Sequence, residues 1–185
     1  MIHTPLLGKA IASASTEPLI SFGKKALEDC KNNVPTEAIE QVALDFIITA
    51  GLVSNFTVHE NNPNPEEDYY YNSSLAHCVY YGASLFPQCE RQHLHGEIVS
   101  FGVLCLLTYD GQFEERNRIF EFNHSIGLPC TLGEIALTPD DVPAIAHKAA
   151  SVVEWKYVPG NPTEDAFINA ILATDKAGKE FLADK

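Results

Sequence analysis

Hydrophobic positions recur at helical spacing along most of the chain. In the clearest stretch, which follows Pro35-Thr36, apolar residues occupy positions i, i+3, i+4, i+7, i+8 and i+11; these are Ile39, Val42, Ala43, Phe46, Ile47 and Ala50. This spacing places them on one face of a helix. A preceding helix is predicted over residues 17–31, with Thr16 as its cap and Pro18 in its first turn, where proline is tolerated.

Similar patterns continue to the end of the chain. Further helices are predicted after a cap at 72–73, over 95–109, over 112–125, after a start signal at 138–141, and over 163–182. The segment that begins at His95 is apolar nearly all round, which is typical of a central buried helix. Residues 57–68 are polar and predict a surface loop. Because no segment alternates with period two, we expect an all-α helical bundle, with residues 1–185 as a single domain.

The net charge of the chain argues against some classes of binding partner. The chain has 12 Lys and Arg residues against 25 Asp and Glu, a formal net charge of -13. Nucleic-acid backbones are bound by clustered basic side chains, so we expect no nucleic-acid partner. The longest apolar stretch, residues 42–53, is interrupted by Asp45 and predicts a core helix; no membrane partner is expected.

The cysteines indicate a cellular compartment. There are five, an odd number without a CxxC pair, and Cys78, Cys105 and Cys130 stand among apolar neighbours. This pattern fits neither a disulfide scaffold nor a zinc knuckle. We therefore expect reduced core thiols in a cytoplasmic protein.

Two histidines are candidates for chemistry. His77 is surrounded by apolar residues, where a lone histidine is by base rate a core residue rather than a ligand. His95 opens the most apolar helix, and the positive end of the helix dipole favours the neutral imidazole that binds metals. A short turn through Pro87 joins the two helices, so an antiparallel pair would bring both histidines to facing surfaces. Zn²⁺ or Fe²⁺ would want a third protein ligand.

The segments around these histidines carry a family resemblance. Residues 74–82 (SLAHCVYYG) and 95–102 (HGEIVSFG) resemble the metal-binding region of the iron-containing (group III) alcohol dehydrogenases, in their glycerol dehydrogenase branch. The corresponding segments of that branch read AHAIHNG and HGEKVAFG. Segments 26–40, 126–129 and 170–175 fit the same branch. The HGE element alone is shared with dehydroquinate synthase and glycerol-1-phosphate dehydrogenase, but the combination, over about residues 21–182, is more specific.

The resemblance implies an activity and a ligand set. Members of the family combine a nucleotide-binding α/β domain with a C-terminal helical domain, and hold a divalent metal by one Asp and two His. His77 and His95 match the two histidines. The implied reaction is NAD-linked, metal-dependent oxidation of glycerol or a related small polyol. We also expect a homo-oligomer.

The chain departs from the family pattern in three respects. No Asp precedes Asp29 to match the family's aspartate ligand, and there is no glycine-rich cofactor loop. We therefore expect a truncated, metal-binding helical half that needs a separate nucleotide-binding chain or domain. The second histidine of AHAIHNG falls on Tyr80, which is predicted to line the substrate side.

Other roles stay open at this stage. Glu97 is predicted to cap its helix or to orient a histidine rather than to bind metal. The alternative to an enzyme half is a non-catalytic helical domain that binds a metal or a protein partner. A two-histidine hydrolase is a weaker alternative, since no HExxH motif is present.

Overall fold

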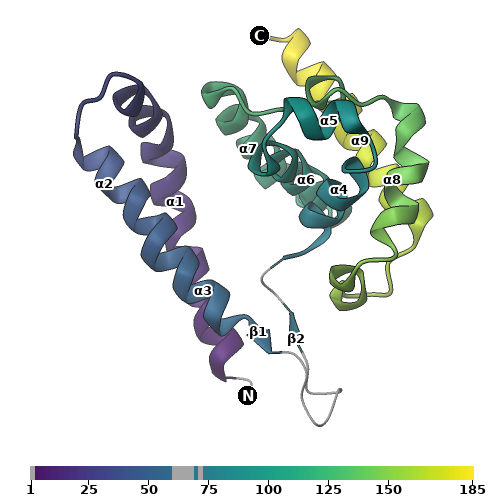
Figure 1. Cartoon of the computed structure of the whole chain (residues 1–185), viewed down its shortest axis with the longest axis horizontal. Coiled ribbons are helices and arrows are strands. Elements are labelled where there is room, and N and C mark those ends of the chain that lie inside the picture. Colours follow the sequence, from purple (N-terminus) through teal and green to yellow (C-terminus); the bar gives the residue numbers. More distant parts are fainter. Residues whose placement is uncertain (1–2, 60–68, 71–72) are drawn as a thin grey trace. The chain divides into compact units, whose positions relative to one another are not determined.

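The structure is a computed structural model that describes residues 3–59, 69–70 and 73–185. The chain divides into two compact units, Met1–Asn72 and Ser73–Lys185 (Figure 1). Helices dominate both, which confirms the predicted all-α fold. Strand structure in the described part is limited to a two-residue antiparallel ribbon between β1 (Val58–His59) and β2 (Tyr69–Tyr70). Whether residues 1–185 form a single domain depends on how the two units pack together, and this stays a prediction. The polar loop predicted over residues 57–68 lies mostly outside the described residues.

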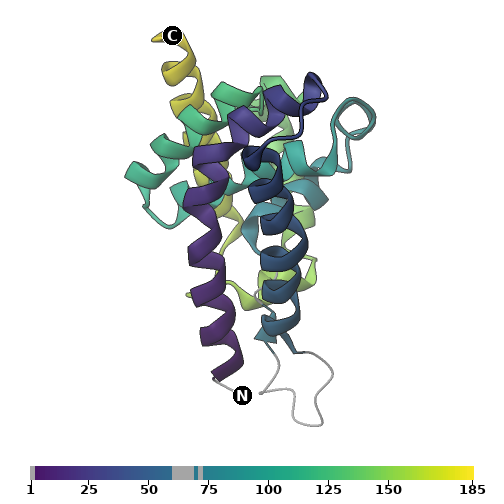
Figure 2. The ribbon, with the colours of Figure 1, turned by 90° about the vertical axis from the view of Figure 1, so that its left-hand side faces the viewer.

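The first unit is a helical hairpin. Helix α1 (His3–Lys31) packs against a second helical rod, built from α2 (Glu37–Leu44), a π-helical turn (Asp45–Thr49) and α3 (Ala50–Phe56), and the two run in opposite directions (Figure 2). Asp29 and Thr36 tie the connection together, because the Thr36 hydroxyl donates to the Asp29 carboxylate at 2.7 Å. Hydrogen bonds from Lys25 and Thr36 lower the pKa of the Asp29 carboxyl.

The predicted start of the first helix is wrong. The helix begins at His3, and Pro18 lies inside it rather than in its first turn. Residues 6–12 are mostly good helix formers, which extend the helix on the N-terminal side of Pro18. The proline removes one backbone donor, which the rest of a 29-residue helix tolerates.

The apolar face predicted for the second rod is not its buried face. Phe46 is 64% exposed and Ile47 75%, whereas Ala38 and Asp45 are buried. The π turn adds a residue to one helical turn and so rotates the side chains around it, and Asp45 is held there by Gln41 and Thr49. Among the described residues, the rod Glu37–Phe56 is long and apolar enough to cross a membrane by length and composition alone, which is weak support for a span.

In the second unit, α6 (His95–Tyr109) packs against α4 (Leu75–Ala83), α7 (Phe113–Ile126) and α9 (Glu164–Ala183) and has a largely buried middle, as predicted for a central helix. The other helices are α5 (Pro87–Gln92) and α8 (Val142–Ala149), with 3₁₀ turns at Gly133–Ile135, Pro139–Asp141 and Val153–Tyr157. The sequence did not predict α5 or the turn Val153–Tyr157. The predicted stop of α7 is confirmed, since Gly127 adopts φ 79°, a left-handed conformation that glycine favours.

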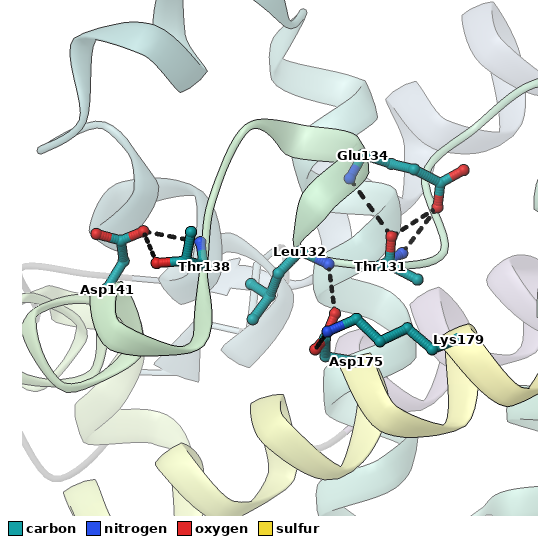
Figure 3. A network of polar contacts seen from close by, with 7 residues as sticks. All are labelled: Thr131, Leu132, Glu134, Thr138, Asp141, Asp175 and Lys179. Carbon is teal, nitrogen blue, oxygen red and sulfur yellow. Dashed lines mark hydrogen bonds and ion pairs between the residues drawn. The ribbon is translucent and has the colours of Figure 1, made fainter.

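Two carboxylates fix the segment between α7 and α8. Asp175 on α9 accepts the backbone N–H of Leu132 at 2.9 Å and pairs with Lys179 at 2.6 Å (Figure 3). Glu134 accepts the hydroxyl and backbone N–H of Thr131, both at 3.0 Å. The bonds of Glu134 close the turn within the segment, and the bond of Asp175 attaches the segment to α9.

The predicted core positions of Cys78, Cys105 and Cys130 are confirmed. All five cysteines are free, and Cys78, Cys105 and Cys130 are buried. Burial raises the pKa of the Cys78 and Cys130 thiols to about 12, so both are neutral near pH 7. These thiols act as small apolar core groups.

Candidate metal centre

The two predicted histidines lie on helices that cross at close range. His77 is in the first turn of α4, and His95 is the first residue of α6. Glycine makes the crossing possible, because a Cβ at Gly102 would lie 2.2 Å from the backbone carbonyl oxygen of Ala76. Helix α5 occupies the connection between α4 and α6. The helix backbones therefore meet one residue from His77.

The imidazole rings lie close together, at a distance that suits a shared ion. The ring centroids of His77 and His95 are 5.4 Å apart, with an angle of 47° between the ring planes. Two imidazoles can share one Zn²⁺, each through a nitrogen about 2.0–2.1 Å from the ion. If the two Zn–N bonds form a tetrahedral angle, the ring centroids lie about 5 Å apart. The spacing of the rings, and the chemistry of two imidazole nitrogens, fit a divalent metal.

Tyr80 packs directly against this pair. It lies almost one helical turn after His77 on α4, and its ring meets that of His95 edge-on at 4.3 Å between centroids. It also contacts the Tyr81 ring at 5.6 Å. The contact restricts rotation of the His95 ring and places a partly exposed aromatic surface beside the two imidazoles.

The surroundings of His77 favour the neutral ring. Burial lowers the pKa of this half-buried imidazole, and the nearby His95 lowers it further, while Glu154 acts in the opposite direction. A neutral ring is the form that binds metals. The His77 ring is therefore in the neutral form that can act as a ligand near pH 7.

Glu154 is a site residue that sequence reasoning missed. It lies in the 3₁₀ turn Val153–Tyr157, is only 3% exposed, and accepts a hydrogen bond from the Ser73 hydroxyl at 3.0 Å. Its charge acts on both His77 and Cys78. The available signal was a single acid between Val153 and Trp155, in a run that is otherwise mainly apolar and aromatic.

Glu97 lies near the predicted site and contacts a different histidine. Its carboxylate accepts the backbone N–H of Leu94 at 3.0 Å, which caps the N-terminus of α6. The same carboxylate lies 3.2 Å from Nδ1 of His93. Within the part of the chain that the structure describes, no three His, Cys, Asp or Glu side chains come together as a metal-binding group, so no third ligand candidate joins His77 and His95 there.

The pH response of His77 is a direct test of this environment. Its pKa in the folded chain is expected below 6.5, because burial and His95 disfavour the cation. As the pH falls, His77 is therefore protonated in the unfolded chain before it is protonated in the folded chain. The free energy of unfolding should fall as the pH drops below 6.5, and should level off below the folded-state pKa. NMR titration of the ring protons without added metal gives the midpoint. His95→Ala should raise it, and a midpoint at or above 6.5 in the parent chain contradicts the described surroundings.

Curated relatives align with almost the whole chain. A glycerol dehydrogenase of Escherichia coli O6:H1 (strain CFT073) is 28% identical over 183 residues, which is 95% of this chain and 45% of the relative. A glycerol dehydrogenase of Pseudomonas putida is 29% identical and covers 90% of the chain, and a glycolaldehyde reductase of Halobacterium salinarum is 27% identical and covers 93%. The chain spans a little less than half the length of these relatives, and no family model matches it.

Solved structures give the same result. The chain superposes on a probable glycerol dehydrogenase from Sinorhizobium meliloti 1021 with a TM-score of 0.78 and 25% identity, over 94% of this chain and 46% of that one. A glycerol dehydrogenase from Schizosaccharomyces pombe shares the fold, with a TM-score of 0.77 at 19% identity, over 97% of this chain and 44% of that one. These similarities confirm the resemblance inferred from residues 74–82 and 95–102.

Proposed function

We propose that this chain, which resembles part of the glycerol dehydrogenases, is the metal-binding helical half of an NAD-linked oxidoreductase for glycerol or a related small polyol. The observation that carries the proposal is the pair of imidazoles from α4 and α6, with ring centroids 5.4 Å apart. The pair lies in the two segments that carry the family resemblance. Names of the relatives support the substrate class: four of them are glycerol dehydrogenases.

Each residue of the site has a role in this proposal. His77 and His95 would hold the ion, Zn²⁺ or Fe²⁺, through neutral ring nitrogens. A bound divalent ion would supply Lewis-acid polarisation of the substrate hydroxyl. Tyr80 fixes the ring of His95 and lines the substrate side with an aromatic face.

The activity needs parts that the described residues do not provide. We propose that a nucleotide-binding chain or domain supplies NAD and a third, carboxylate ligand for the metal. A homo-oligomer and a cytoplasmic location belong to the same proposal. Four buried free thiols support a reducing compartment.

Metal binding by the two histidines is the decisive test. We expect the purified chain to bind one Zn²⁺ per molecule, and His77→Ala and His95→Ala to weaken binding by about 100-fold each, because a single imidazole is a poor site. Calorimetric titration with Zn²⁺ measures this. His147→Ala is the matched control, because this side chain is 82% exposed and lies on α8. Unchanged affinity in both site variants rejects the proposal.

One observation favours a second function, that of an interaction module. Large apolar side chains are exposed along the rod of α2, the π turn and α3; they include Leu44, Phe46, Ile47, Ile48 and Leu52. Exposed apolar surface of this extent commonly marks a binding face. Size-exclusion chromatography with light scattering separates the two functions: an oligomer that binds no Zn²⁺ supports the interaction module alone.

A further inference from the structure

The candidate metal centre is open to solvent at the first turn of α6. His95 is exposed, and so are the residues on either side of it, Leu94 (74% exposed) and Gly96. A Cβ at Gly96 would meet no heavy atom within 4 Å, so space remains beside this turn. A small molecule can therefore reach an ion held by His77 and His95 from the side of α6.

The side chain that borders the two imidazoles is aromatic. The Tyr80 ring meets the His95 ring edge-on at 4.3 Å between centroids, and it contacts the Tyr81 ring at 5.6 Å. Tyr80 is also partly exposed, so part of its surface is left for a further contact. Aromatic rings favour contact with other rings and with apolar groups. A group bound at the ion beside His95 therefore lies next to an aromatic surface.

The carboxylates described near the site already have donors of their own. Glu97 accepts the backbone N–H of Leu94 at 3.0 Å and lies 3.2 Å from Nδ1 of His93. Glu154 is 3% exposed and accepts the hydroxyl of Ser73. The site thus offers an aromatic ring more readily than a carboxylate to the part of a substrate that lies beyond the ion.

We propose that Tyr80 is a specificity-determining residue of this centre, and that its ring selects small diols that carry an apolar substituent, an alkyl or phenyl group, over glycerol. The inference rests on the proposed function and deepens it, because it names the part of the polyol class that the site fits. An apolar substituent would pack against the Tyr80 ring. The third hydroxyl of glycerol would exchange water for an aromatic surface, which is unfavourable for a group that finds no hydrogen bond there.

The test uses two metal-binding probes that differ in their apolar part. Benzohydroxamate and acetohydroxamate bind Zn²⁺ through the same pair of oxygen atoms, and carry a phenyl or a methyl group. Calorimetry gives the preference for the phenyl probe on the full chain loaded with Zn²⁺, and this is divided by the preference of free Zn²⁺. We expect a ratio of about 3 to 10, the size typical of one aromatic contact. A ratio near one overturns the inference.

Variants of Tyr80 separate its ring from its hydroxyl. Tyr80→Phe keeps the ring, so the ratio should persist, whereas Tyr80→Gln and Tyr80→Ala remove it and should lower the ratio to about one. A purely structural effect of Tyr80 on Zn²⁺ affinity cancels in this ratio. The control is Phe113→Ala, at an aromatic position on α7 that is 53% exposed. A preference that survives loss of the ring, or that is lost in Tyr80→Phe, overturns the inference.

The reference variants His77→Ala and His95→Ala distinguish the two levels of the proposal. If both lose Zn²⁺ and the ratio of the parent chain is near one, only the role of Tyr80 fails. If the parent chain binds no Zn²⁺, or binds it independently of both histidines, the metal centre itself fails, and the inference fails with it.

Discussion

Gly102→Ala is expected to destabilise the second unit by about 3 kcal/mol and to weaken metal binding at the same time. A Cβ at this position would lie 2.2 Å from the carbonyl oxygen of Ala76 and 2.9 Å from its carbonyl carbon. Both atoms belong to the backbone of α4, so no side-chain rotation can relieve the overlap. The helices must separate, and His77 is the residue after Ala76. Thermal or denaturant unfolding measures the first effect, and Zn²⁺ calorimetry measures the second.

Gly96→Ala is the matched control on the same helix. A Cβ at Gly96 meets no heavy atom within 4 Å, so the substitution adds only helix propensity. We expect a stability change of less than about 1 kcal/mol, in the stabilising direction. If both substitutions have the same effect, the close approach of α4 and α6 does not depend on Gly102, and the geometry assigned to the histidine pair is wrong.

The helices that sequence patterns predicted well are those with clear end signals. Helix α6 begins at His95 and ends before Asp110-Gly111, and α9 begins after Thr163, whose hydroxyl accepts the backbone N–H of Ala166. These local signals act whatever the tertiary context is. The pairing of His77 with His95 was also predicted from sequence, but the connection is not the short turn expected there, because it contains helix α5.

Other features depend on interactions that local pattern does not contain. The π turn at Asp45–Thr49 turns Asp45 inward and leaves Phe46 exposed, although the helical spacing of apolar residues predicted the reverse. Pro18 indicated a helix start, but good helix formers at residues 6–12 extend the helix beyond it toward the N-terminus. Glu154 reaches the site from 77 positions beyond His77. Only the packing of the turn Val153–Tyr157 against α4 reveals it.

Asp175→Ala is expected to lower the free energy of unfolding by about 3 kcal/mol. The Asp175 carboxylate is 3% exposed and accepts the backbone N–H of Leu132, a residue that is itself buried (Figure 3). Alanine leaves this N–H without its acceptor and removes the partner of Lys179. The segment between α7 and α8 then loses its polar attachment to α9. Urea unfolding followed by circular dichroism measures the loss.

A graded series shows which bond of Asp175 matters. Asp175→Asn keeps an oxygen for the Leu132 N–H but gives up the charge, so we expect a loss of only about 1 kcal/mol. Lys179→Ala removes the ion pair, and because the Lys179 side chain is 58% exposed, its effect should stay below about 1 kcal/mol. We expect the largest loss of stability in Asp175→Ala and a smaller loss in Asp175→Asn. If the loss in Lys179→Ala is no larger than the loss in Asp175→Asn, the effect comes from the buried backbone amide of Leu132. Equal losses in Asp175→Ala and Lys179→Ala would instead assign it to the ion pair, and would contradict the role of Asp175 as the buried acceptor that holds Leu132 against α9.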